Sequence, residues 1–133
     1  MIRILLCCGG GFSSSYLTVK MQNEIKDKNL QDEVLIDFYP FKLVDEKIGN
    51  YDIVMCCPHL NFEMKRYVKA HHPKIPFYLL PPRMYGLMSF DELYQDAKDV
   101  IKEFKQTKMN PFHFPGEENN LRIERSQAYY HIH

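Results

Sequence analysis

The chain has 133 residues, 45% of them hydrophobic, enough to bury the core of one domain without disulfide bonds. Its 17 basic and 17 acidic residues give zero formal net charge, which argues against nucleic-acid binding through bulk charge. No apolar run approaches the roughly 18–20 residues that a membrane span requires, and the N-terminus has no secretory signal pattern. We therefore expect a cytoplasmic protein, not itself membrane-spanning, with reduced cysteines.

Four short apolar runs predict strands, and three longer stripes predict helices between and after them. The strands are expected at residues 2–6, 34–39, 52–57 and 76–80, and prolines bound the last three. The helical stripes are Leu17, Met21 and Ile25; Leu60, Met64, Tyr67 and Val68; and Phe90, Leu93, Ala97, Val100, Ile101 and Phe104. Each stripe repeats at helical spacing and so marks the face that a helix buries.

Shorter patterns fill the connections. Residues 41–48 predict at most a short helix, and residues 81–86 predict a loop. Ser89 and Glu92 match a capping box at the start of the last helix, with Met88 and Leu93 spaced as its hydrophobic staple.

Alternation of strands with helices predicts an α/β fold. We expect a three-layer, Rossmann- or flavodoxin-like domain, in which helices cover both faces of a four-stranded parallel sheet. Right-handed crossovers favour the strand order 2-1-3-4. The first strand ends at Cys8 and the third at Cys57, so both strand ends fall at the topological switch point, where such sheets bind ligands.

The strand-to-helix turn after Cys8 combines a thiol, three glycines and three hydroxyls. Glycines let successive backbone N–H groups turn toward an anion, and the following helix adds its free N–H groups and the positive end of its dipole. A thiol held there ionises more easily, because the dipole favours the thiolate. Residues 8–15 therefore predict an anion cradle beside a nucleophile, although the glycines are also consistent with a tight turn alone.

Two familiar nucleotide motifs are absent from this turn. No lysine follows the glycines, as a Walker A loop would require. The glycines stop at Gly11, and Asp37 is the only acid near the end of the second strand that is a candidate for binding a ribose, so a dinucleotide fingerprint is poorly matched.

A cysteine opening an anion-binding turn suggests covalent phosphate chemistry, and three functions remain open. A phosphatase resembling the low-molecular-weight cysteine enzymes needs an arginine about six positions beyond the cysteine, where this chain has Ser14. A carrier that passes a phosphoryl group on needs no such arginine. A regulatory module would hold an anion without covalent chemistry.

The four cysteines occur as two adjacent pairs, Cys7-Cys8 and Cys56-Cys57. Zinc ligands normally leave two to four residues between them, so the spacing does not favour a metal site. Cysteines in buried strands act as small hydrophobic side chains, which is our interpretation of Cys7 and Cys56. We expect neither a metal nor an organic cofactor.

The turn resembles a known family. Cys8, Gly11 and residues 13–15 are similar to the phosphocysteine loop of the enzyme IIB component, lactose/cellobiose (chitobiose) class, of the bacterial phosphoenolpyruvate-dependent sugar phosphotransferase system. The resemblance extends through residues 52–58 to Tyr85-Gly86 and the last helix. It covers roughly residues 1–105, which we expect to form a IIB-like phosphocysteine domain followed by a tail at residues 106–133.

The resemblance implies a function as well as a fold. Cys8 would accept a phosphoryl group from a phosphohistidine of a IIA component and pass it to a sugar bound by the membrane-embedded IIC component, which recruits the protein to the inner face of the membrane. The catalytic activity would be that of a sugar phosphotransferase. The phosphate would be held by the backbone and hydroxyls that follow Cys8, namely those of Gly9, Gly10, Gly11, Phe12, Ser13, Ser14 and Ser15.

Two basic residues follow other strands at the same edge of the predicted sheet. His59 comes after the third strand and Arg83 after the fourth, so both are candidates for contacting the phosphate or a partner protein, or are simply solvated side chains. The tail at residues 106–133 has no helical or alternating stripe, and we expect it to be disordered or to pack against a neighbour. Its aromatic residues favour packing.

Overall fold

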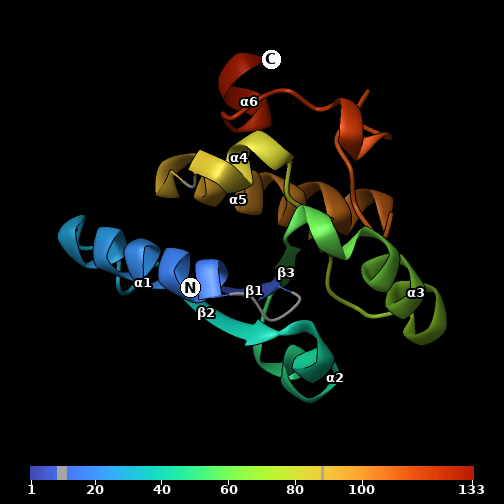
Figure 1. The fold of residues 1–133 in the computed structure, drawn as a ribbon, viewed down its shortest axis with the longest axis horizontal. Coiled ribbons are helices and arrows are strands. Elements are labelled where there is room, and N and C mark those ends of the chain that lie inside the picture. Colours follow the sequence, from blue (N-terminus) through green and yellow to red (C-terminus); the bar gives the residue numbers. More distant parts are fainter. Residues whose placement is uncertain (9–11, 88) are drawn as a thin grey trace.

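The computed structural model describes residues 1–8, 12–87 and 89–133, and gives the backbone but not the side chains of residues 8, 12–15, 17 and 121. Figure 1 shows helices around a central sheet, with the C-terminal segment along one side. The main elements in chain order are β1 (Ile2–Cys8), α1 (Phe12–Asp27), β2 (Val34–Pro40), α2 (Val44–Lys47), β3 (Ile53–Cys56), α3 (Asn61–His71), β4 (Phe77–Leu79), α4 (Pro82–Leu87), α5 (Phe90–Thr107) and α6 (Tyr129–Ile132). Single turns of 3₁₀ helix are η1 (Phe41–Leu43), η2 (Ile48–Asn50), η3 (Pro58–Leu60) and η4 (Asn120–Arg122).

The sheet has four parallel strands in the order β2-β1-β3-β4, as the sequence predicted. β1 is central, with Cys7 opposite Tyr39 on β2 and Cys56 on β3. Because all strands run in the same direction, the ends of β1, β3 and β4 meet at one edge of the sheet. The two faces of the sheet bury different residues, and each face has its own apolar core.

One face packs against α1, α5 and the C-terminal segment, defined here as residues 108–133. Ile4 and Leu6 of β1 point to this face and are almost fully buried. Met21 and Ile25 of α1 meet them, as the four-residue spacing of that stripe requires. The core also takes in Leu93, Ala97 and Val100 of α5.

The other face packs against α2 and α3. Leu5 and Cys7 alternate with the residues of the first face and point into this second core. Met64 and Val68 of α3 and Val44 of α2 cover them. Burial on both faces explains why β1 and β3 are nearly continuous apolar runs.

The predicted loop at residues 81–86 is wrong, because this stretch forms α4. Pro82 occupies the first helical position, where its fixed φ suits the helix. Proline has no N–H, but an N–H at this position would have no acceptor within the helix. The N–H of Tyr85 donates to the carbonyl of Pro81 at 2.9 Å, and Met84 is fully buried against the first core. Tertiary packing of Met84 therefore stabilises a helix at a stretch where the two prolines and Gly86 predict a loop.

The predicted capping box at the start of α5 is also wrong. Ser89 occupies the N-cap position with extended backbone angles, but its side chain makes no capping hydrogen bond within the described residues. Glu92 instead accepts a hydrogen bond from the N–H of Ala128 at 2.7 Å and contacts the Nδ1 atom of His131. The carboxylate therefore holds the C-terminal segment rather than its own helix end. The proposed staple partner Met88 lies outside the described residues.

The C-terminal segment is part of the domain core. Phe112, Phe114 and Tyr129 are buried among the residues of the first face, and the rings of Phe114 and Tyr129 stack with centroids 4.7 Å apart. The N–H of Phe112 donates to the carbonyl of Phe77 at 2.8 Å, and Phe112 bridges Tyr78 in parallel fashion. The segment thereby runs along the outer edge of β4.

A buried ion cluster fixes this segment to α5 and β4. The Arg125 guanidinium donates to Asp96 of α5 at 2.9 Å, to both carboxylate oxygens of Glu117 at 2.6 and 2.8 Å, and to the Tyr78 hydroxyl at 2.8 Å. Asp96 also accepts from the Tyr78 hydroxyl and from the N–H of Tyr129. Burial raises the pKa of Asp96 above its ordinary value, against the lowering effects of Arg125 and the N–H of Tyr129. Every strong donor and acceptor in the cluster has a partner, as burial of charges demands.

Replacing Asp96 by alanine should destabilise the fold by about 3–5 kcal/mol, because the buried Arg125 guanidinium loses a carboxylate that it needs. Asp91→Ala on the same helix is the matched control. The Asp91 side chain is 62% exposed and pairs with Lys28 at 3.3 Å, so its loss should cost less than about 1 kcal/mol. Urea denaturation followed by circular dichroism measures both. Equal midpoints for the two variants would contradict the assigned role of the cluster.

Replacing Phe114 by alanine should cost about 3–5 kcal/mol, since the fully buried ring leaves a cavity in the first core. Phe62→Ala removes the same side chain from a site where it is 78% exposed, and should change stability by less than about 0.5 kcal/mol. Thermal unfolding of the two variants distinguishes a C-terminal segment that belongs to the core from one that only covers it. A Phe114→Ala variant as stable as Phe62→Ala would show that the C-terminal segment does not belong to the core.

Candidate functional site

The end of β1 lies between the ends of its two neighbouring strands. Cys8 is the last residue of β1 and stands opposite Pro40, the last residue of β2. The N–H of Cys57 donates to the carbonyl of Cys7 at 3.0 Å, which continues the β1–β3 pairing one step past β3. This edge, between β1 and β3, is the switch point at which parallel α/β sheets bind ligands.

Several predicted phosphate-binding residues lie outside what the structure describes. Gly9, Gly10 and Gly11 are outside the described residues, as is the side chain of Cys8. Residues 12–15 are described by their backbone, which forms the first turn of α1. Helix α1 therefore begins at Phe12, four residues after Cys8. The first N–H groups of a helix have no partner within the helix and favour an anion.

The other three cysteines are fully buried. Cys7, Cys56 and Cys57 have no exposed surface and belong to the core between the sheet, α2 and α3. Burial raises the pKa of the Cys56 thiol well above its usual value, and the nearby Cys7 and Cys57 add to that effect. Cys56 is therefore a neutral packing residue and not a nucleophile. Among the described residues, no group of three or more histidine, cysteine, aspartate or glutamate side chains is placed to hold a metal ion.

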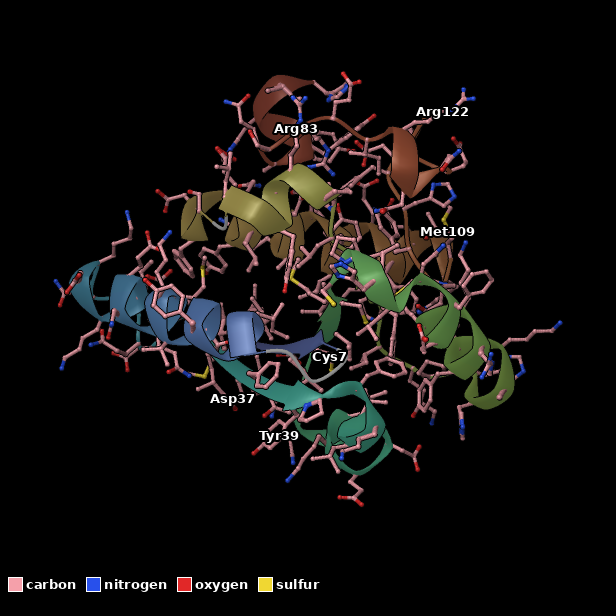
Figure 2. The ribbon with its side chains drawn as sticks, viewed as in Figure 1. Cys7, Asp37, Tyr39, Arg83, Met109 and Arg122 are labelled. Carbon is pink, nitrogen blue, oxygen red and sulfur yellow. The ribbon has the colours of Figure 1, made fainter. Side chains whose placement is uncertain are left out.

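His59 and Arg83 both lie just beyond strands at this edge of the sheet. His59 is exposed in η3, after β3, and its ring packs edge-on against Tyr85 of α4, with centroids 6.4 Å apart. Arg83 is exposed on α4, after β4. Figure 2 labels Arg83 on α4 and Tyr39 on β2.

Asp37 has a structural partner. The Tyr51 hydroxyl donates to its carboxylate at 2.7 Å, and burial together with this carboxylate raises the pKa of Tyr51. Asp37 lies in the middle of β2, opposite Leu5, and not at the strand end where a ribose-binding acid would stand. Figure 2 labels it on β2. The contact explains why an acid occurs in an otherwise apolar strand.

One cation near this edge was missed by sequence reasoning. The Lys47 ammonium of α2 lies 4.5 Å from the ring centroid of Tyr39, the residue opposite Cys7. Such a contact is worth roughly 0.5–1 kcal/mol at an exposed site. Because α2 is only one turn long, no helical stripe in the sequence signals its orientation.

Together, the strand order, the helices on both faces and the position of Cys8 define a flavodoxin-like α/β domain with its candidate site at the β1–β3 edge. The family model described as "PTS system, Lactose/Cellobiose specific IIB subunit" matches residues 3–103. The chain belongs to this family of sugar phosphotransferase system IIB subunits, and so to proteins with a phosphotransferase role in sugar transport.

The solved structures similar to this chain include two IIB proteins. The cellobiose-specific phosphotransferase IIB component from Borrelia burgdorferi is 28% identical with a TM-score of 0.62, over 77% of this chain and 93% of that one. The lactose-specific IIB component domain from Streptococcus pneumoniae is 14% identical with a TM-score of 0.51, over 81% of this chain and 98% of that one. The second likeness concerns the fold alone.

The family assignment has two further aspects. IIB subunits work with IIA and IIC components of the same transport system, so partners of these kinds are expected for the family. In the part of the chain that the structure describes, no helix combines the length and the apolar character needed to cross a bilayer.

Alkylation of the native protein should spare Cys7, Cys56 and Cys57, because none of them has exposed surface. Iodoacetamide treatment followed by peptide mass spectrometry should give at most one modified cysteine in the native state and four after unfolding. Modification of Cys56 before any other thiol would contradict the burial and the raised pKa described above.

Proposed function

We propose that Cys8 carries the phosphoryl group of this IIB subunit, accepting it from a phosphohistidine of a IIA component and passing it to a sugar held by a IIC component. The position of Cys8 supports this proposal, because it ends the central strand directly before the glycines and α1. Membership of the IIB family supports the reaction class. Burial of the other three thiols leaves Cys8 as the candidate nucleophile.

The proposed chemistry has two displacement steps. In the first, the Cys8 thiolate attacks phosphorus, a P–S bond forms as the P–N bond of phosphohistidine breaks, and the leaving imidazole takes up a proton. In the second, a sugar hydroxyl attacks phosphorus, an O–P bond forms as the P–S bond breaks, and the hydroxyl proton is released. The products are a sugar phosphate and the Cys8 thiolate, which is ready to accept the next phosphoryl group. Helix α1 favours both thiolate and phosphate through its dipole.

The backbone N–H groups of residues 9–15 and the hydroxyls of Ser13, Ser14 and Ser15 are proposed to hold the phosphate. Three hydroxyl donors and several backbone donors suit three phosphoryl oxygens. Ser14 stands where a phosphatase would need its arginine, which favours a carrier over a hydrolase. His59 and Arg83 follow β3 and β4 at the same edge, and we assign them to the second shell or to the partner surface.

The proposed location follows from the proposed partners. The protein acts in the cytoplasm and is recruited to the inner face of the membrane by its IIC component. No metal or organic cofactor takes part in either step.

Incubation with phosphoenolpyruvate, the general upstream carriers and a matched IIA should add one phosphoryl group to a single cysteine peptide. Cys8→Ser should remove the acid-labile adduct, because a seryl hydroxyl is not ionised at neutral pH. Cys7→Ala is the matched control and should keep the adduct. Intact-protein and peptide mass spectrometry measure both.

Three other outcomes would contradict the proposal. An adduct that survives Cys8→Ser would place the phosphoryl group elsewhere. Turnover of an aryl phosphate that Cys8→Ala abolishes would indicate a phosphatase. Phosphate binding that Cys8→Ala leaves intact, with no adduct from any matched IIA, would indicate an anion-binding regulatory module.

A further inference from the structure

A cavity of about 340 Å³ lies at the amino-terminal edge of the sheet, the edge opposite Cys8. Its lining combines the start of β1, the residue before β3, the loop before β4 and the last turn of α5. The path along β1 from Ile2 to Cys8 is about 20 Å long, at roughly 3.3 Å per residue of parallel strand. The volume falls within the range of small-molecule sites, about 300–1,000 Å³. The proposed phosphoryl transfer uses no part of this cavity.

Hydrogen bonds hold the walls of the cavity in place. The side-chain amide of Asn110 donates to the carbonyl of Ile75 at 2.9 Å and accepts from the N–H of Phe77 at 2.8 Å. These bonds join the loop that carries Lys74 to the segment that follows Lys108. The two walls are therefore linked by the fold itself and form a site that exists before any ligand arrives.

The floor of the cavity is apolar. Pro76 and Phe104 line it and are buried. Ile2 and Ile101 also line it, and both are half-buried and pack against the first core. Because these side chains are already ordered by the fold, the apolar part of a ligand can cover them without the cost of fixing loose side chains.

Three exposed lysines surround this floor, namely Lys74, Lys105 and Lys108. In the part of the chain that the structure describes, none of the three forms an ion pair. The lining has one carboxylate, that of Asp52, and Arg3 donates to it from its backbone N–H at 2.8 Å and from its guanidinium at 3.3 Å. The cavity therefore carries an excess of positive charge, in a protein whose formal net charge is zero.

The end of α5 accounts for only part of this charge. Lys105 lies in the last turn of α5 and Lys108 at its C-cap, where the helix dipole favours a cation. The dipole contributes about half a negative charge there, which is less than the charge of one lysine. Lys74 lies in the loop between α3 and β4, beyond the last turn of either helix. A net positive potential is left, and it favours an anion.

We propose that this cavity is a binding site for a small organic anion with an apolar body and a carboxylate or phosphate head. The apolar body covers Phe104, and the head pairs with the three ammonium groups. A neutral ligand would leave the ammonium groups unpaired, and an inorganic ion would leave the apolar floor in water. Lys105 and Lys108 lie beyond residue 103, where the family match ends, so part of the site comes from outside the matched region.

The test uses the full-length, unphosphorylated protein with phenylphosphonate, inorganic phosphate and benzyl alcohol as probes. Titration followed by NMR chemical-shift changes should show saturable binding of phenylphosphonate, with the largest shifts at residues 1–3, 74–76 and 101–108. Inorganic phosphate and benzyl alcohol should each bind there at least about fivefold more weakly, because one lacks the apolar body and the other lacks the charge.

A triple variant tests the role of the lysines. Lys74→Gln, Lys105→Gln and Lys108→Gln together should weaken phenylphosphonate binding roughly tenfold, since each exposed ion pair contributes a factor of about two. Raising the NaCl concentration from about 0.05 M to about 0.5 M should weaken the wild-type complex as well, because salt screens exposed charges. All three side chains are exposed, so the variant should fold.

The matched control changes the net charge by the same amount at exposed lysines that do not line the cavity, namely Lys26→Gln, Lys42→Gln and Lys65→Gln. It should bind phenylphosphonate as the wild type does, within about twofold. An equal loss of binding in the two triple variants would overturn the proposal, because it would show a response to net charge rather than to this cavity.

Four further outcomes would also overturn the proposal. They are the absence of saturable phenylphosphonate binding at the cavity residues, equally tight binding of inorganic phosphate there, equally tight binding of benzyl alcohol there, and binding to phosphatidylglycerol vesicles in place of any soluble probe. Shifts at residues 12–15 report on the phosphate site proposed beside Cys8 and are fitted separately. Failure at the cavity therefore leaves the assignment of Cys8 untouched, since none of the probes donates a phosphoryl group.

Discussion

The central place of β1 in the sheet is the constraint on which the candidate site depends. β1 pairs with β2 on one side and β3 on the other, and its residues alternate between two buried cores. A strand held in this way cannot shift by one residue, since that would exchange every side chain between the faces. Cys7 is thereby committed to the interior, and the chain leaves the sheet at Cys8. Packing on both faces of the sheet therefore fixes the position of Cys8, the residue to which we assign the phosphoryl chemistry.

The C-terminal segment extends the hydrophobic core beyond the region that matches the family. The family match ends at residue 103, yet Phe112, Phe114 and Tyr129 complete the core on one face of the sheet. Arg125 links this segment to Asp96 of α5 and to the Tyr78 hydroxyl of β4 through buried hydrogen bonds. Burial lowers the pKa of Arg125, but its hydrogen bonds to Glu117 and the neighbouring charges raise it overall, so it remains a cation.

The regular features of the fold were predictable, because they follow from periodicity that a single segment displays by itself. Met21 and Ile25 of the first helical stripe are buried in one core with Ile4 and Leu6 of β1, and the predicted strand order, which followed from chain connectivity, is confirmed. The features that were missed depend on distant contacts. Glu92 has the spacing of a capping residue but binds Ala128, and α4 forms because Met84 finds a buried site. Of the residues near the candidate site, the sequence placed His59 and Arg83 after the third and fourth strands, where the structure has them, but no local pattern marks Lys47.

The pairing of Phe112 with the outer strand of the sheet also bears on how copies of this protein meet one another. An uncovered outer strand offers a row of amide donors and carbonyl acceptors to any passing chain, and so invites aggregation. At β4 the C-terminal segment occupies part of that row, since the carbonyl of Phe77 already accepts from Phe112 and the N–H of Phe77 already donates to Asn110. The same polypeptide that closes the core therefore also protects this flank of the sheet from intermolecular strand addition.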